Sequence, residues 1–394
     1  MGSIERIEAV AERLSRDQAA GVAPVAVVSA MAGETNRLVA LANAIDPQSR
    51  GPAYDMLVAS GEQVSVALLA IALEKRGMKA KPMLAHQLGI KTDSVYSKAR
   101  IHEIRTDELQ GLVAAGVIPV IAGFQGVDEF GNVTTLGRGG SDTTAVAIAA
   151  ALKDKECEIF TDVPAIFTAD PRMVPKAREI SSLSFEEMME MAGLGSKVLH
   201  IRCVEIAAKY GVKIHLRSSF EQREGSWIVA ENEKAVGMEN PVVSSVTHDP
   251  NTVVFEVHPV PKGPLFLAQL FRSLSDKGVV VDIITQSEVP QGQRLAFSVT
   301  EEDLPLAKTV LSAALNSVKG AEIVIREKMA KISVVGVGMR NHPGVAARFF
   351  EVLARERVHV HLVTTSEIKI SAVIDKEALA RAAQHLHTEF NLDR

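Results

Sequence analysis

Thr134-Thr135-Leu136-Gly137-Arg138-Gly139-Gly140-Ser141-Asp142-Thr143-Thr144-Ala145 is the most specific stretch of this 394-residue sequence. It is a glycine-rich turn that runs into an apolar helix. Glycine lets the backbone approach a ligand closely, Ser141 or Asp142 can cap the helix, and the free N–H groups at a helix start favour an anion. The stretch is neither a Walker loop nor a dinucleotide fingerprint. It predicts a phosphate cradle, although an ordinary turn before a helix would look the same in isolation.

The turn lies in a region of alternating helices and strands that ends near residue 222. Short runs of continuously apolar residues predict strands covered on both faces. Such strands are expected over Val25 to Ser29, Val117 to Ala122, Glu158 to Thr161 and Val212 to Arg217. Helices are expected over Ser3 to Ser15, Gln63 to Arg76, Asp107 to Ala115, Asp142 to Leu152 and Phe185 to Met191. The alternation predicts a three-layer αβα domain with a mostly parallel sheet.

Composition narrows the class of protein. The chain is long enough for two or three domains. The 43 Lys and Arg nearly balance the 48 Asp and Glu, and no basic block is present, which argues against a nucleic-acid partner. Cys157 and Cys203 are too few for a disulfide framework and lack the spacing of a metal site. With no apolar run of about 20 residues and no signal-like start, we expect a cytoplasmic protein without a membrane segment.

The second region contains an internal repeat at a shift of 79 residues. The stretch Val279 to Glu288 then aligns with Val358 to Glu367, and each copy reads strand, helix, strand, strand, helix. Glu322 to Arg326 can close the first copy, whereas the second copy lacks a last strand. Because an unpaired sheet edge is a liability, we predict that Val242 to Thr247 completes the second copy, so that one module is inserted in the other.

Two further stretches in the first region could contact a ligand. Val27 to Asn36 is a strand that leads through small residues into a helix, the usual place for ligands in α/β folds. Ser60-Gly61-Glu62 puts a carboxylate at the start of another helix. Taken alone, Glu62 could be a favourable first-turn charge and Thr35 a helix cap.

These stretches, together with several others, resemble the aspartokinase family of the amino-acid-kinase fold in their order and spacing. The other matching stretches are Gly123 to Gly126, Thr161 to Val163, Thr168 to Arg172, Gly195 to His200, Val334 to Arg340 and Thr365 to Ser371. The resemblance covers essentially the whole chain and implies a kinase domain followed by two βαββαβ ACT domains. It places the kinase domain at 1–222, a linker at 223–241, the first ACT domain at 252–328 and the second at 242–251 plus 329–394.

The resemblance implies that the chain phosphorylates the side-chain carboxylate of L-aspartate with ATP and Mg²⁺, as the first step of lysine, threonine and methionine biosynthesis. Arg138 would hold the α-carboxylate of aspartate through its planar fork, and Ser29, Thr35 and Glu62 would position the rest of the substrate. Asp142 would be the family's organising carboxylate. No residue is assigned as a dedicated metal ligand.

On the same basis, Lys197 would neutralise charge on the ATP phosphates. The remaining nucleotide-binding candidates are Gly139, Gly140, Ser141, Thr161, Asp162, Asp170 and Arg172. Without the family context, Lys197 could be a surface lysine and Asp170-Pro171-Arg172 a simple turn.

Family effector sites form where ACT domains meet, so the resemblance also implies a homodimer or larger oligomer that binds lysine, threonine or both. The candidate effector residues are Asp282, Gln286, Arg340, Asn341, Thr365, Ser366 and Glu367. Turn caps and polar groups on edge strands are equally good interpretations of these residues.

The sequence departs from the family at several points. It lacks the usual opening strand with Lys-Phe/Tyr-Gly-Gly-Thr-Ser, which we interpret as a start site placed too late. Pro164 to Phe167 replaces Asp-Gly-Val-Tyr on the adenine side, and Lys262 to Leu265 replaces the Asp-x-Pro-Gly of the first ACT domain. Two alternatives therefore stay open. The chain could be another amino-acid kinase, such as acetylglutamate kinase, or a catalytically impaired amino-acid-binding or regulatory homologue.

Overall fold

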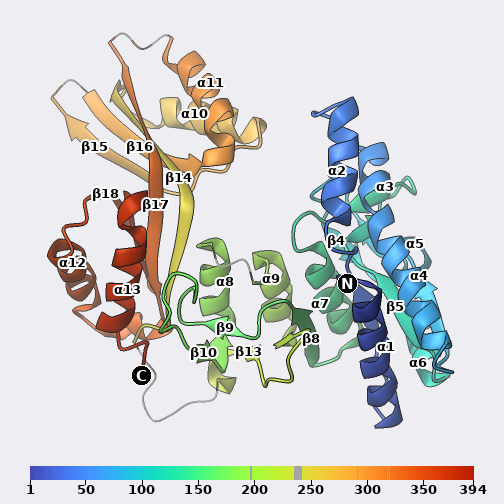
Figure 1. The fold of residues 1–394 in the computed structure, drawn as a ribbon. Coiled ribbons are helices and arrows are strands. Elements are labelled where there is room, and N and C mark those ends of the chain that lie inside the picture. Colours follow the sequence, from blue (N-terminus) through green and yellow to red (C-terminus); the bar gives the residue numbers. More distant parts are fainter. Residues whose placement is uncertain (196–197, 235–241, 291, 317, 319) are drawn as a thin grey trace. The chain divides into compact units, whose positions relative to one another are not determined.

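The computed structural model describes residues 1–195, 198–234, 242–290, 292–316, 318 and 320–394 (Figure 1). The chain divides into two compact units, each made of several segments. Unit 1 comprises Met1–Ala165, Ser181–Met189 and Lys197–Lys234, and unit 2 comprises Ile166–Ile180, Glu190–Ser196 and Ala235–Arg394. The chain therefore passes back and forth between the units before its C-terminal part begins.

Unit 1 contains the predicted parallel strands. One parallel sheet has the order β1-β5-β2, with β1 (Ala26–Val28), β5 (Ile118–Ala122) and β2 (Ala80–Met83). A second sheet has the order β11-β13-β12-β8, with β11 (Ser182–Ser184), β13 (Ser226–Val229), β12 (Lys213–Ser218) and β8 (Glu156–Thr161). In this second sheet β8 is parallel to β12, whereas β13 is antiparallel to β12. The α/β class is confirmed, but the parallel strands belong to two sheets rather than one, and β13 lies within the expected linker.

Helices cover both faces of the β1-β5-β2 sheet. The helices from the N-terminus to Tyr210 are α1 (Ile4–Ala19), α2 (Glu34–Ile45), α3 (Pro52–Val58), α4 (Ser60–Glu74), α5 (Ala85–Leu88), α6 (Asp107–Ala114), α7 (Gly140–Leu152), α8 (Phe185–Gly193) and α9 (Ile201–Tyr210), of which α9 contacts β12 of the second sheet. On one face Val120 of β5 packs with Ile7 of α1 and Leu69 of α4. On the other face Ile121 packs with Ile148 of α7. Neighbouring residues of one strand thus enter opposite cores, as the continuously apolar sequence predicted.

A small third sheet supports the glycine-rich turn. Its order is β4-β3-β6-β7, with β4 (Ile101–Glu103), β3 (Lys91–Thr92), β6 (Gln125–Val127) and β7 (Val133–Thr135). The hydroxyls of Thr92 and Thr134, both buried, lie 2.6 Å apart in this sheet. Because β7 ends at Thr135, the sheet delivers the chain directly into the turn at Gly137 to Gly140.

The helical stretch Pro52–Glu74, formed by α3 and α4, corrects the expectation that the chain contains no apolar stretch of membrane-spanning length. By length and composition it could cross a membrane, although 56% of its apolar 18-residue segment is buried inside the protein. Val66, Leu69 and Leu73 fill the core against α1 and β5. Its apolar character is explained by that core position.

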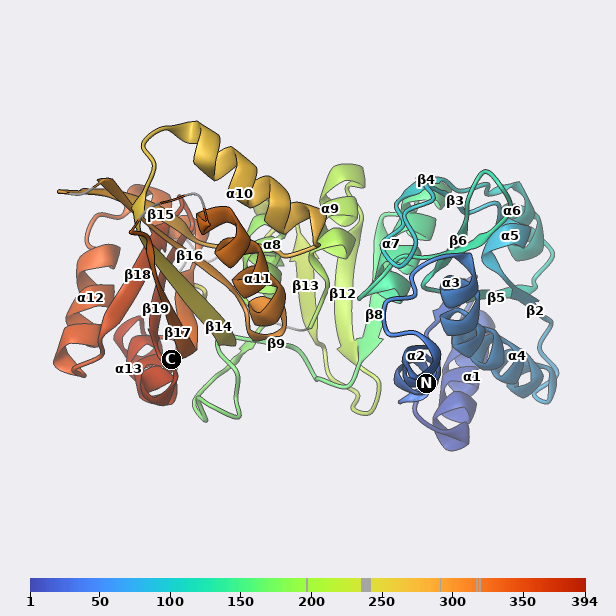
Figure 2. The ribbon, with the colours of Figure 1, turned by 90° about the horizontal axis from the view of Figure 1, so that it is seen from above.

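Unit 2 is built on a six-stranded antiparallel sheet with the order β15-β16-β14-β17-β19-β18. The strands are β14 (Ser245–Val260), β15 (Ile284–Val289), β16 (Gly292–Thr300), β17 (Glu322–Val335), β18 (Val360–Thr365) and β19 (Lys369–Asp375). The helices are α10 (Pro264–Asp276), α11 (Leu304–Leu315), α12 (Val345–Arg355) and α13 (Leu379–Glu389). Helices α10 and α11 pack side by side, as do α12 and α13 (Figures 1 and 2).

The two long strands, β14 and β17, serve both copies of the repeat. The first part of β14, from Ser245 to Asp249, pairs with β17 from Val335 back to Lys331. Its second part pairs with the beginning of β17 and with β16. One core lies under α10 and α11 around Phe255 and Phe297, and another lies under α12 and α13 around Phe349.

Residues 166–180 belong to unit 2. In this segment β9 (Ile166–Phe167) pairs with β10 (Glu179–Ile180). Ala169 and Val174 are part of the α12 and α13 core. The hydroxyl of Thr168 lies 2.8 Å from Nε2 of His387, a histidine of α13 with no exposed surface. A segment with a predicted role in nucleotide binding thus fills part of the C-terminal core.

Candidate functional site

The candidate site begins where β1 and β5 end. The strands are parallel, with Val28 opposite Ala122, so their carboxyl ends lie at one edge of the sheet. The Gly123 N–H donates to the carbonyl of Val28 over 3.0 Å, which joins the two strand ends. Ser29 follows β1 and is exposed. This edge is the position at which open α/β sheets bind ligands.

Glu62 reaches this edge from the first turn of α4. The backbone N–H of Ala30 donates to its Oε1 over 3.1 Å, while its Oε2 has no hydrogen-bond partner among the described residues. The side chain is only 3% exposed, and burial raises the pKa of its carboxyl to about 7. A buried polar atom without a partner is costly unless something binds it. Glu62 is therefore a good candidate to receive a ligand cation.

Gly61 explains how Glu62 comes so close to the strand end. A Cβ atom on Gly61 would lie 2.9 Å from the Cβ of Ala30, closer than packed side chains tolerate. Glycine lets the start of α4 touch the loop after β1. Thr35, in the first turn of α2, is half-buried, and this helix begins a few residues after Ser29.

The glycine-rich turn runs into α7. Gly139 is the N-cap residue, with a left-handed φ of 64°, and the helix begins at Gly140 without a side-chain cap. The prediction that Ser141 or Asp142 caps the helix is therefore wrong, because both already lie inside its first turn. A Cβ on Gly123 would lie 2.8 Å from that of Ser141. The helix start thus packs on the β5 end, and a helix N-terminus favours an anion.

Asp142 lies in the same first turn and is half-buried. Burial alone raises the pKa of its carboxyl to about 6. Thr144, two residues further along the helix and fully buried, accepts a hydrogen bond from the Phe124 N–H over 3.1 Å. Thr144 thus joins α7 to a residue just beyond the β5 end, and Asp142 lies in the first turn of the same helix.

Arg138 is exposed at the tip of the turn. A Cβ on Gly139 would lie 2.2 Å from the Cβ of His200, so the turn rests directly on the residue that precedes α9. Burial, and then the neighbouring cations Arg202 and Arg138, lower the pKa of His200. A neutral imidazole can support the turn without adding repulsion to its arginine.

The predicted nucleotide-binding residues lie in different parts of the chain. Thr161 ends β8, and its hydroxyl donates to Asp162 over 3.2 Å. Asp170 and Arg172 belong to unit 2, where they form an ion pair with each other at 2.8 Å. Lys197 lies outside the described residues.

Sequence reasoning missed three residues that hold the turn: Asp55, His200 and Arg202. The Arg202 guanidinium donates to the carbonyls of Leu136 over 2.6 Å and Ala99 over 2.9 Å. His200 was part of a matching stretch, but the pattern gave it no role. Asp55 carried no local signal, because its partners are distant in sequence.

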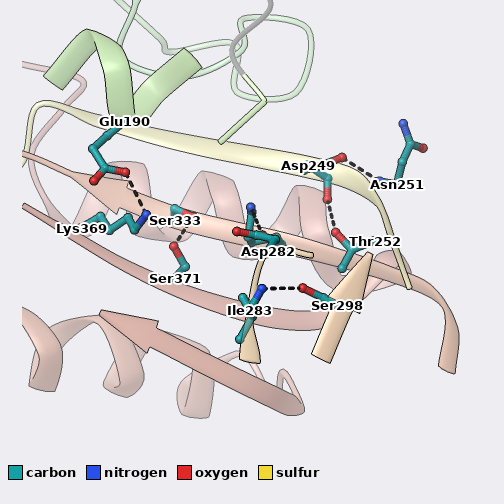
Figure 3. A network of polar contacts seen from close by, with 11 residues as sticks. Glu190, Asp249, Asn251, Thr252, Asp282, Ile283, Ser298, Ser333, Lys369 and Ser371 are labelled. Atoms are coloured by element: carbon teal, nitrogen blue, oxygen red, sulfur yellow. Dashed lines mark hydrogen bonds and ion pairs between the residues drawn. The ribbon is translucent and has the colours of Figure 1, made fainter. Parts of the chain in front are cut away.

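The candidate effector residues lie in unit 2, and most already have protein partners. Asp282, labelled in Figure 3, pairs with Lys331 of β17, and Gln286 of β15 donates to Gln293. Arg340 pairs with Glu367 over 3.0 Å. Ser366 receives a hydrogen bond from the Ile368 N–H over 3.4 Å.

The other two candidates, and a neighbouring ion pair, complete this region. Thr365 is exposed at the end of β18, and the side chain of Asn341 lies outside what the structure describes. Beside them, Lys369 of β19 pairs with Glu190 of α8 over 2.9 Å (Figure 3). Thr365, Ser366 and Glu367 thus occupy the exposed end of β18 and the turn that follows it, whereas Gln286 lies within the edge strand β15.

Comparison with known proteins places these features in a family. Residues 1–218 match the amino acid kinase family, and residues 332–390 match an ACT domain. The chain is 45% identical over 394 residues to an aspartokinase of Pseudomonas aeruginosa, covering all of this chain and 95% of that protein. It is 40% identical over its whole length to aspartokinase 2 of Bacillus subtilis, covering 96% of that protein.

Solved structures agree. The structure of Escherichia coli aspartokinase III with aspartate and ADP superposes with a TM-score of 0.80 at 26% identity, covering 98% of this chain and 96% of that one. The structure of the same enzyme with lysine and aspartate gives a TM-score of 0.74 at 26% identity, with 96% and 95% covered. The chain therefore belongs to the aspartokinase family, as an aspartate kinase with an amino-acid-kinase domain and a C-terminal ACT region.

Proposed function

We propose that this chain transfers the γ-phosphoryl group of ATP to the side-chain carboxylate of L-aspartate, giving 4-phospho-L-aspartate and ADP. The observation that carries this proposal is a carboxylate oxygen of Glu62 that has no hydrogen-bond partner among the described residues. It is buried at the sheet edge against which the start of α7 also packs. A buried anion beside an anion-binding helix start suits a ligand with both an ammonium and negatively charged groups.

Glu62 would pair with the α-ammonium of aspartate, and Arg138 with its α-carboxylate. The guanidinium fork binds a carboxylate through two parallel hydrogen bonds. Ser29, at the end of β1, and Thr35, in the first turn of α2, would add hydrogen bonds. These contacts would leave the side-chain carboxylate free to react.

The phosphates would bind at the start of α7, with Gly139, Gly140 and Ser141 providing close backbone approach. Thr161 and Asp162, at the end of β8, would contact the rest of the nucleotide, and Asp142 would orient cations at the phosphates. Roles for Lys197, Asp170 and Arg172 in holding the nucleotide stay part of this proposal.

Magnesium would arrive with the nucleotide. Within the described part of the chain, no group of three or more His, Cys, Asp and Glu side chains could hold a metal ion alone. Mg²⁺ is usually bound by one or two carboxylates together with substrate phosphates and water. Asp142 and Asp162 would supply the carboxylate oxygens, and the bound ion would neutralise charge on the phosphates.

The reaction needs no nucleophilic side chain. One oxygen of the aspartate side-chain carboxylate forms a bond to the γ-phosphorus while the bond from that phosphorus to the bridging oxygen breaks, and ADP leaves with the electron pair. The protein contributes positioning and charge stabilisation, which dominate in phosphoryl transfer. Arg138 and Glu62 hold the attacking molecule, and the start of α7 faces the developing negative charge.

The test traps the product with hydroxylamine. Purified protein with ATP and Mg²⁺ should form a hydroxamate from aspartate but not from N-acetylglutamate or glutamate, and ADP release should match it one to one. Hydroxamate from N-acetylglutamate alone would establish the other amino-acid kinase. Calorimetric binding of ATP and aspartate without turnover would establish a binding or regulatory protein instead.

We also propose that lysine, threonine or both bind the ACT region and regulate the kinase. The family relative from Escherichia coli was solved with lysine. Strands β15 and β18 form the two edges of the unit 2 sheet, and edge strands readily pair with another chain. Pairing there would give the homodimer or larger oligomer and bring the effector residues of two chains together.

Inhibition assays test this regulation. At least one of the two amino acids should reduce hydroxamate formation at a concentration that depends on Asp282, and analytical ultracentrifugation should show an assembly larger than one chain. A monomer whose activity ignores both amino acids would contradict the proposal.

A further inference from the structure

Asp55 is a buried carboxylate in the middle of α3 with no exposed surface. Its oxygens accept hydrogen bonds from the Ser97 N–H at 3.0 and 2.9 Å and from the Ser97 hydroxyl at 3.1 Å. They also accept a hydrogen bond from the Thr135 N–H over 2.6 Å. One side chain thus holds two backbone segments that lie 42 and 80 residues further along the chain.

Both segments lie directly beneath the Arg138 turn. Thr135 is the last residue of β7, three positions before Arg138, and its carbonyl accepts a hydrogen bond from the Ala99 N–H over 2.9 Å. A Cβ on Gly137 would lie 2.8 Å from the carbonyl oxygen of Ser97. The loop around Ser97 therefore supports the turn at Gly137, as His200 supports it at Gly139.

The backbone at Ser97 is itself held in an unfavourable conformation. Its φ is 65°, in the left-handed region that residues other than glycine rarely adopt. Such a conformation persists only where the surroundings fix it. Asp55 supplies that constraint, because it bonds both the N–H and the hydroxyl of this residue.

Arg202 holds the same loops through their carbonyl groups. Asp55 binds N–H groups of Ser97 and Thr135, whereas Arg202 binds the carbonyls of Ala99 and Leu136. The two charged groups therefore clamp the base of the turn without contacting Arg138.

Asp55 also connects the turn to Glu62. Helix α3 continues through Ala59 into α4, and the Ala59 N–H donates to the carbonyl of Asp55 over 3.0 Å. Asp55 and Glu62 thus lie on one continuous helical stretch, Pro52–Glu74. An anchor on this stretch that also holds the Arg138 turn sets the separation between the two groups proposed to bind aspartate.

We propose that Asp55 is a positioning residue that holds the Arg138 turn at the correct distance from Glu62 for binding the amino-acid substrate. This inference rests on the proposed function. Asparagine cannot replace Asp55, because it offers one acceptor oxygen and would point an NH₂ group at backbone N–H donors. Small displacements of a binding group are costly in a site that works by positioning.

The test compares Asp55→Asn with a matched control, Glu187→Gln. Glu187 is also a buried carboxylate of unit 1, and it accepts hydrogen bonds from the Ser184 N–H over 3.1 Å and from Lys234 over 2.6 Å, neither of which lies in the loops beneath the Arg138 turn. Asp55→Asn should raise the KM for aspartate by about 10- to 100-fold with a KM for ATP within about twofold of wild type. Glu187→Gln should lower the melting temperature and leave both constants unchanged.

Ser97→Ala serves as a milder variant that keeps the backbone and loses one donor to Asp55. It should fold and raise the KM for aspartate by roughly fivefold, the effect of one hydrogen bond. If Asp55→Asn fails to fold, this variant decides the question. An unchanged KM for aspartate in Ser97→Ala and Asp55→Asn, or an equal rise for ATP and aspartate, would overturn the positioning role.

Calorimetric titration of aspartate separates this role from the proposed function. A wild-type chain that binds no aspartate would overturn the proposed function and this role together. A wild type that binds aspartate, with Asp55→Asn binding it equally well, would overturn the positioning role alone.

Discussion

The candidate substrate site of unit 1 and the candidate effector residues of unit 2 differ in how their charges are satisfied. Glu62 is 3% exposed and has a carboxylate oxygen without a partner among the described residues. In unit 2, the side chain of Asp282 is 47% exposed and pairs with Lys331, and Arg340 pairs with Glu367. A ligand at Glu62 would satisfy a group that folding left unpaired. A ligand at Asp282 would have to share or replace a protein partner, which links its binding to a change in protein contacts.

The largest effect should come from Glu62→Gln. We expect kcat/KM for aspartate to fall by about 100- to 1,000-fold, since the proposed ammonium partner loses a desolvated charge. The hydroxamate assay measures this, and Glu74→Gln, at an exposed position of the same helix, is the control. The melting temperature of Glu62→Gln should not fall, because a buried carboxylate with an unpaired oxygen is removed. A fall in kcat/KM of less than tenfold would contradict the claim that the substrate pairs with the buried carboxylate of Glu62.

The next effect concerns the pair in unit 2. The side chain of Lys331 is 5% exposed, so Asp282→Asn would leave a buried ammonium without its anion. We expect this variant to lose about 2 to 3 kcal/mol of unfolding free energy in urea titrations. Lys331→Met should lose less, because Asp282 can turn to water. If Lys331 competes with an effector ammonium, Lys331→Met should also lower the inhibitory concentration of lysine or threonine, and an increase would exclude competition.

A third effect follows from the raised pKa of Glu62. Its pKa of about 7 in the folded chain lies above the ordinary carboxyl value, so the folded state holds this proton more tightly than the unfolded state. The contribution of Glu62 to stability therefore falls as pH rises from the ordinary carboxyl pKa to about 7 and is constant above that. Only the ionised form pairs with an ammonium, so aspartate affinity should rise about tenfold between about pH 6 and pH 8.

Calorimetry without ATP measures this dependence and avoids the titration of Asp142 near its phosphate position. The rise in affinity should disappear in Glu62→Gln. A wild-type affinity that stays flat across this range would assign the binding of the ammonium to another group.

The smallest effect should come from Glu367→Gln. The side chains of Glu367 and Arg340 are 77% and 46% exposed, and exposed ion pairs contribute about 0 to 1 kcal/mol. Unfolding free energy should change by less than about 0.5 kcal/mol. The inhibitory concentration of the effector should still shift if Glu367 contacts it. A large loss of stability without any change in inhibition would make the pair structural.

Local patterns predicted the elements but not their long-range contacts. A continuous apolar run located β5, whose five residues are all buried, whereas β12 alternates buried and partly exposed residues and is not covered on both faces as expected. Helix α7 begins at Gly140, two residues before the predicted start at Asp142, because a left-handed glycine rather than a polar side chain precedes the helix. Asp55 could not be found from the sequence, because its hydrogen bonds join loops far apart in the chain. The Asp282–Lys331 pair also joins the two repeat copies, which periodicity alone does not align in space.

The segment 166–180 has a practical consequence for dividing the chain. Ala169 and Val174 belong to the core under α12 and α13, and Thr168 reaches His387 there. A regulatory fragment beginning after residue 234 would lack these side chains and expose the apolar surface that they cover. Exchange of C-terminal halves between relatives should therefore preserve sensitivity to an effector only when this short segment is transferred with them.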